Sequence, residues 1–158
     1  MAYRQSRNIE ASLIDFLTAN LNADWSGVSC EKTFAKIYEI DLPSVWIRTS
    51  VTTHDKAQIG DDATIRTVQV LIDIFAENDG QKLDLIDYIV SKIKNGCIYY
   101  EYTIANGQVQ SKTANGRIRI MDIDVTLIDE GTDKEKLDVH DRYRALITLS
   151  ASLGRIEA

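Results

Sequence analysis

The chain has 158 residues, about the size of one domain, and its 44% hydrophobic and 27% charged residues are ordinary values for a globular protein. A single proline and the lack of biased tracts exclude a disordered chain. The formal net charge of -6 argues against wrapping nucleic acid, because phosphate binding needs clustered lysine and arginine. We predict one domain over residues 1–158.

The first predicted element is an amphipathic helix from Ser6 to Leu21. Its apolar side chains recur at helical spacing, at Ile9, Leu13, Phe16, Leu17 and Leu21. The stretch Val28–Ile40 is mixed and fits either a short strand or irregular structure. After Pro43, the β-branched and aromatic residues of Ser44–Thr53 predict a strand.

A strand, a loop and a second helix are predicted in the middle of the chain. His54–Asp62 is polar and contains glycine, which predicts an exposed loop between antiparallel strands. Thr64–Ala76 alternates as a strand with Val68, Val70, Ile72 and Ile74 on one face. Asn78 or Asp79 caps the next helix, which ends at Asn95–Gly96. Its apolar stripe is Leu83, Ile86, Ile89, Val90 and Ile93.

Three or four further strands follow. Cys97–Ile104 alternates, with Ile98, Tyr100, Tyr102 and Ile104 on one side, and Asn106–Gly107 is a hairpin turn. Arg117–Ile128 is a long strand whose apolar phase shifts near Met121, which indicates a bulge. Asp129–Asp141 is an acidic, solvated connection, and Tyr143–Leu153 alternates as a closing strand. This order predicts an α+β fold, a mostly antiparallel β-sheet with two α-helices packed on one face.

The acidic turn Glu77–Lys82 precedes a helix, where a phosphate loop would lie. It lacks the glycine spacing of phosphate-binding motifs, and its acids would repel an anion. The turn is therefore better explained as a helix cap.

Three carboxylates, Asp73, Asp122 and Asp124, lie on strands that a sheet would bring near one another and would suit Mg²⁺. The alternative is an exposed sheet face on which acids meet bases across strands. The bases available for that pairing are Arg117, Arg119, Arg142 and Arg144.

No sequence motif frames a nucleophile or a metal site. The two histidines, His54 and His140, lie in polar segments, and Cys30 and Cys97 lack the spacing of a redox or zinc motif. A tyrosine group suits either base stacking or, in view of the interleaved Glu101, packing and subunit contact. Its members are Tyr99, Tyr100, Tyr102 and Tyr143. We expect no enzyme, no cofactor, and no catalytic or metal-binding residue.

Four segments carry a resemblance to a known family. They are the helix end Phe16–Leu21, the strand start Leu42–Ile47, the strand Arg66–Phe75 and the helix Leu83–Ile89. In this layout the chain resembles, over roughly residues 6 to 130, the tail terminator (tail completion, neck) proteins of tailed bacteriophages. The acidic segment Asp129–Asp141 and the closing strand exceed what a minimal subunit of that family needs.

The resemblance implies a structural virion protein that assembles as a hexameric ring. Such a ring caps the finished tail tube and joins it to the head connector, with a channel through which DNA passes without specific binding. The implied partners are further copies of the chain, the tail tube protein and the connector or neck protein, and no membrane. The implied location is the tail or neck of the virion, assembled in the cytoplasm of the bacterial host.

Within that reading, the long polar loop faces the channel or an interface through His54, Asp55, Lys56, Gln58, Asp61 and Asp62. Exposed strand edges at Ser44–Thr53 or Arg142–Leu153 make the subunit contacts, with the residues Trp46, Arg48, Arg142 and Arg144. A neck or head-completion adaptor and a tail-tube subunit remain as alternatives. A metal-dependent enzyme using Asp73, Asp122 and Asp124 is the non-structural alternative.

Overall fold

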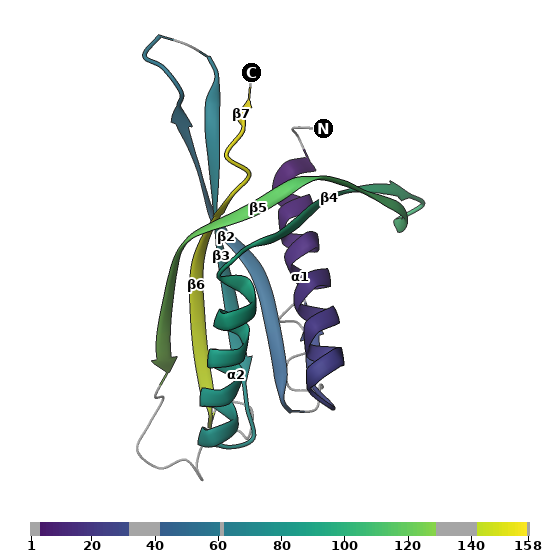
Figure 1. Ribbon diagram of the computed structural model, residues 1–158, viewed down its shortest axis with the longest axis vertical. Helices are drawn as coiled ribbons and strands as arrows, with labels where there is room; N and C mark the ends of the chain where they lie inside the picture. Colours follow the sequence, from purple (N-terminus) through teal and green to yellow (C-terminus); the bar gives the residue numbers. More distant parts are fainter. Residues whose placement is uncertain (1–3, 32–41, 61, 129–141, 158) are drawn as a thin grey trace.

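The computed structural model describes residues 4–31, 42–60, 62–128 and 142–157. Two helices and a largely antiparallel sheet make up the domain, so the predicted α+β fold is confirmed (Figure 1). The helices are α1 (Gln5–Asp24) and α2 (Asp79–Ile93). The strands are β1 (Ser29–Glu31), β2 (Ser44–Lys56), β3 (Thr64–Phe75), β4 (Cys97–Ala105), β5 (Gln108–Ile128), β6 (Arg144–Ser152) and β7 (Ile156–Glu157). Neither helix is long and apolar enough to cross a bilayer.

The sheet runs in the order β1-β2-β3-β6-β5-β4, with β7 paired to the start of β3. The pair β1–β2 is parallel and the other pairs are antiparallel. The strand β5 has two partners along its length. Its first part, Gln108–Ile118, pairs with β4, and its second part, Arg119–Ile128, pairs with β6.

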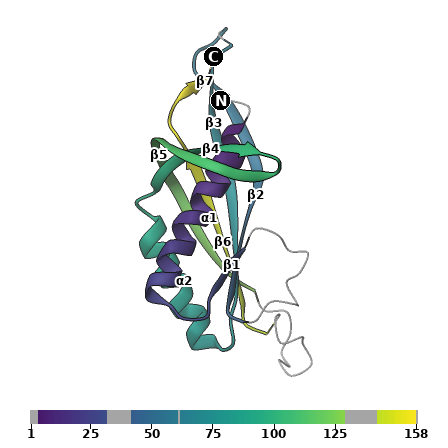
Figure 2. The ribbon, with the colours of Figure 1, turned by 90° about the vertical axis from the view of Figure 1, so that its right-hand side faces the viewer.

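Both helices lie on one face of the central strands β2, β3 and β6, as Figure 2 shows. The predicted stripe of α1 is buried at Ile9, Leu13, Leu17 and Leu21. With the buried residues of α2 it forms one core with alternate strand residues, which include Val45, Ile47, Val68, Val70, Ile72, Ile74, Ala145, Ile147, Leu149 and Ala151. The period of two along these strands places the next residues of each strand on the opposite face, which the helices leave open.

The helix α2 begins and ends where the sequence predicts. The Asn78 side chain accepts a hydrogen bond from the Gln81 N–H at 2.8 Å, and Gly96 follows the helix with a φ of 75°. The predicted stripe is wrong at one position. Leu83 is 44% exposed and Leu85 is buried instead, because the buried face follows Leu85, Ile86, Ile89 and Ile93.

The hairpin of β2 and β3 is longer than the sequence analysis predicts. Pairing continues to Lys56 and Thr64, so His54, Asp55 and Lys56 belong to a strand and not to a loop. The short turn between them is closed by the Ala57 N–H, which donates to the Ala63 carbonyl at 3.0 Å. The polarity that predicts a loop here reflects a strand, β2, whose residues from Ser50 to Lys56 are exposed on both faces.

The hairpin of β4 and β5 turns at Asn106 and Gly107, both with positive φ, as predicted. The predicted bulge in β5 is also confirmed, between Ile120 and Asp122. The face assignment in β4 is wrong, because Cys97 and Tyr99 enter the core while Ile98 is 46% exposed. The predicted connection at Asp129–Asp141, with His140, and the loop residue Asp61 lie outside the described residues.

Candidate interaction surfaces

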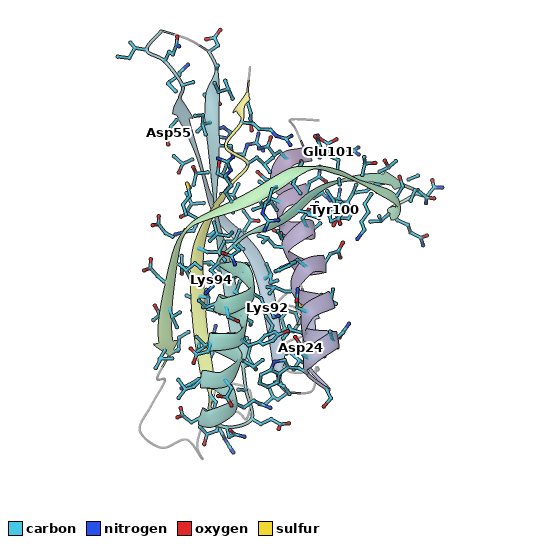
Figure 3. The ribbon with its side chains drawn as sticks, in the orientation of Figure 1. Asp24, Asp55, Lys92, Lys94, Tyr100 and Glu101 are labelled. Carbon is cyan, nitrogen blue, oxygen red and sulfur yellow. The ribbon has the colours of Figure 1, made fainter. Side chains whose placement is uncertain are left out.

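The β2–β3 hairpin projects well beyond the helices (Figure 1), and Asp55 lies on this projection (Figure 3). The predicted channel or interface residues that the structure describes, His54, Asp55, Lys56, Gln58 and Asp62, are all exposed. Ile59, at the turn, is also fully exposed. The structure thus gathers these predicted residues at one end of the molecule, on an antiparallel arm.

The base of this arm is tied to the rest of the domain by side-chain hydrogen bonds. The Glu10 carboxylate on α1 accepts from the Thr49 N–H at 3.1 Å and from the Thr49 hydroxyl at 2.6 Å. On β3, the Arg66 guanidinium donates to Ser6 of α1 and to Glu157 of β7, each at 3.0 Å. The arm therefore extends from a braced base.

The open face of the sheet carries a buried acid between two arginines. Asp73 is 1% exposed and receives hydrogen bonds from Arg48 at 3.5 Å and from Arg144 at 3.4 Å. The Arg144 guanidinium also lies 4.9 Å from the centre of the Phe75 ring. Burial raises the pKa of Asp73, and the two arginines act in the opposite direction.

This cluster changes the interpretation of the predicted subunit-contact residues. Trp46 is buried beside Phe75 and its indole donates to Ser44, while Arg48 and Arg144 pair with Asp73 of the same chain. The predicted edge at Arg142–Leu153 is wrong, because β6 has β3 on one side and β5 on the other. Arg142 is half-buried just before β6.

The structure does not bring together the carboxylates Asp73, Asp122 and Asp124. Asp73 is on β3, while the other two are on β5, two strands or about 10 Å across the sheet. Within the described residues, no three side chains of histidine, cysteine, aspartate or glutamate lie close enough to hold a metal ion. In those same parts of the chain, no ion pair joins Asp122 or Asp124 to an arginine, so the predicted cross-strand pairing holds for Asp73 with Arg144 alone.

The remaining reactive residue types are also apart from one another. His54 is exposed on the arm in β2, whereas Cys97 is buried at the start of β4. Burial raises the pKa of the Cys97 thiol to about 11, so that thiol is protonated at neutral pH.

A cleft of about 320 Å³ lies between α1 and the β4–β5 hairpin. Its apolar lining includes Phe16 and Tyr100, and Figure 3 shows Tyr100 beside α1. The charged groups at this cleft are paired within the chain. Asp15 accepts from the Tyr102 hydroxyl at 2.6 Å, and Lys112 lies 4.6 Å from the centre of the Tyr100 ring. The cleft therefore presents few polar groups to a ligand.

A second surface, which the sequence analysis missed, is the outer edge of β5. From Arg119 to Ile128 this strand pairs with β6 on one side, and within the described residues no strand pairs with its other side. Three apolar side chains are exposed along it, Met121 at 53%, Val125 at 44% and Leu127 at 54%. The signal in the sequence is that apolar residues occur at these positions of the strand, which the helices do not cover.

No protein-family model matches the chain, and no curated protein matches it significantly.

Proposed function

We propose that this chain is the subunit of a ring, of six copies, that caps a bacteriophage tail tube. In this proposal the ring joins the tail to the head connector and leaves a channel through which DNA passes. The tail tube protein and the connector or neck protein are its partners, and the virion tail or neck is its location. Its role is structural, and the chain performs no chemistry.

The observation that carries the proposal is the braced arm of β2 and β3. A side-chain network at Thr49 and Arg66 fixes the base of the arm, whereas its strand residues from Ser50 to Lys56 are all exposed. The paired residues Thr64–Thr67 of β3 are half-buried, so the exposed side of the arm is β2. A strand whose side chains bury so little adds little stability to a monomer. An arm of this kind is explained when a neighbouring subunit or an adjoining ring covers it.

The surroundings of the reactive and charged side chains favour a function at the surface over one in a pocket. The buried Asp73 is held between arginines, the thiol of Cys97 is protonated, and the cleft beside α1 has its charges paired. The formal net charge of -6 suits a channel that must not retain DNA.

Light scattering after size-exclusion chromatography, over a range of protein concentration and salt, tests the proposal. We expect a discrete hexamer, or a labile equilibrium between monomer and hexamer, and single rings in electron micrographs. Open-ended tubes would instead identify a tube subunit. A monomer at every concentration would contradict ring formation by the chain alone and favour an adaptor that assembles on its partner.

A further inference from the structure

The outer edge of β5 lies on the opposite side of the sheet from β2, so the described residues leave a strand edge without a partner strand at both sides of one sheet. We propose that the outer edge of β5 in one copy pairs with the β2 side of the arm in the next copy. The sheet then continues from subunit to subunit around the ring. This inference rests on the proposed function and names the two surfaces that build the ring.

The backbone of β5 is prepared for such pairing. Ile123–Ile128 forms a regular ladder with β6 and contains no lysine, proline or glycine, the residues that natural edge strands use to prevent association. The charged residues on this edge are Asp122, next to the bulge, and Asp124 beyond it. An edge this regular and apolar on a soluble chain is a template for another strand.

The outer edge of β2 is partly occupied within the chain and partly open. β1 pairs with Ser44–Trp46, and the Glu10 carboxylate accepts a hydrogen bond from the Thr49 N–H. In the described residues, no strand pairs with the outer side of Ser50–Asp55, and Val51 on it is 55% exposed. This segment of six residues matches the six residues of Ile123–Ile128 in length.

Charge favours β2 over a second β5 as the partner strand. The β5 edge from Ile120 to Ile128 carries two acids and no base. In β2, Arg48 is held by Asp73 of the same chain, and the exposed segment Ser50–Asp55 carries the single acid Asp55, so it repels the β5 edge less than a second β5 edge would. Opposite charges across a strand pair are stabilising, and like charges are not.

The positions of the two edges also favour a contact between different surfaces. The arm and the free part of β5 lie toward opposite ends of the molecule in Figure 1. When the arm of one copy pairs with the edge of the next, the first copy still has its own β5 edge and the second still has its own arm. Further copies therefore add one after another until the ring closes. Two β5 edges that paired with each other would stop at a dimer.

The double variant V125K/L127K tests the edge, because both side chains are more than two-fifths exposed and tolerate substitution in the folded monomer. The matched control is V109K, which places lysine on β5 at a residue 60% exposed but in the part paired with β4. We expect at least a tenfold loss of association for the double variant and normal rings for the control. Normal rings from the double variant would refute the β5 contact and leave the proposed ring intact.

Mixing two variants tests the direction of the contact. V51K alters the arm and keeps the β5 edge, whereas V125K/L127K alters the edge and keeps the arm. If the arm of one copy meets the edge of the next, neither variant forms rings alone, and an equimolar mixture gives a 1:1 heterodimer through the one intact pair of surfaces. Normal rings from V51K would refute the arm as the partner.

Hydrogen exchange on the unaltered protein supplies a test that needs no variant. The backbone amides in peptides covering Ser50–Lys56 and Ile123–Ile128 should both exchange more slowly when the protein is concentrated enough to pass from monomer to ring. Slower exchange in only one of the two peptides, or in neither, would overturn the inference. A chain that stays monomeric at all concentrations would overturn both this contact and the self-assembled ring.

Discussion

Asp73 shows how one residue combines burial and charge on the face that the helices leave open. Its carboxylate is 1% exposed, yet two guanidinium groups contact it. The sequence analysis identifies the acid and one of its bases, Arg144, as members of a sheet face with mixed charge. It cannot identify Arg48 as the second base, because that requires the register of β2 against β3.

The raised pKa of Asp73 leads to a pH dependence of stability. Since the folded-state pKa lies above the ordinary value of 3.8, the stabilisation from protonation is fully present below that value and is lost as pH rises through the raised pKa. We expect the wild type to gain stability relative to D73N as the pH falls from neutral, because asparagine does not titrate. Urea unfolding of both proteins at several pH values measures this, and a pH-independent difference would contradict it.

Two glycines with the same backbone conformation differ in what surrounds them. Gly27 and Gly96 both have a φ of 75°. A Cβ at Gly27 would meet nothing within 4 Å, whereas a Cβ at Gly96 would clash with the Ile118 carbonyl oxygen on β5.

G27A should therefore cost about 1–2 kcal/mol, the strain of a left-handed alanine alone. G96A should cost a further 1–3 kcal/mol or so, because the clash is with backbone. Thermal unfolding of the two variants separates the backbone strain, which both share, from the clash, which only G96A has. Equal losses of stability would show that β5 moves away from Gly96 without cost.

At the scale of elements, local signals fix helix ends better than strand ends. The cap at Asn78, the stop at Gly96 and the turn at Asn106–Gly107 are all predicted from residues within a few positions, and all are confirmed. The C-terminal end of β2 is not predicted, because polar residues such as His54 and Asp55 form a ladder only through their partners. Leu83 and Leu85 are both leucine, so periodicity alone does not decide which one faces the core.

The cap of α2 provides a prediction at this scale. N78A removes the acceptor for the Gln81 N–H and should cost about 1 kcal/mol, whereas N78D keeps an acceptor at a helix N-terminus and should cost much less. Chemical denaturation of the three proteins measures the difference. Equal stability of N78A and the wild type would mean that the Gln81 side chain, which accepts from the Glu77 N–H at 2.7 Å, maintains the turn by itself.

At the scale of the whole molecule, the sequence predicts the layers but not the order of strands. The closing strand looks like an edge because it comes last in the chain, yet β6 inserts between β3 and β5. Long-range pairing of this kind leaves no local pattern, and it is the reason that the free edge falls on β5. The candidate surfaces were accordingly predicted at the arm and missed at the β5 edge.

The projecting arm provides a prediction for the assembly. Deleting Lys56–Gly60 brings together Asp55 and Ile65, which are directly paired, through a four-residue connection. Stability should change by no more than about 0.5 kcal/mol, because the removed residues are at the exposed tip of the arm.

We expect the deletion variant to form rings, since Ser50–Asp55 remains, but to impair joining of tails to heads. Electron microscopy of particles assembled with the variant should show separate heads and tails. Circular dichroism controls for folding, and a normal yield of joined particles would exclude a role for the tip in joining.

The length of β5 has a mechanical consequence. One unbroken backbone runs from the tip of the β4–β5 hairpin to the free edge beside β6, and it bends where Gly116 has a φ of 105° and at the bulge after Ile120. The hairpin tip and the edge are therefore joined by one hydrogen-bonded strand instead of by a loop. In the proposed ring, a partner bound at the hairpin tip would be connected through β5 to the contact between neighbouring subunits.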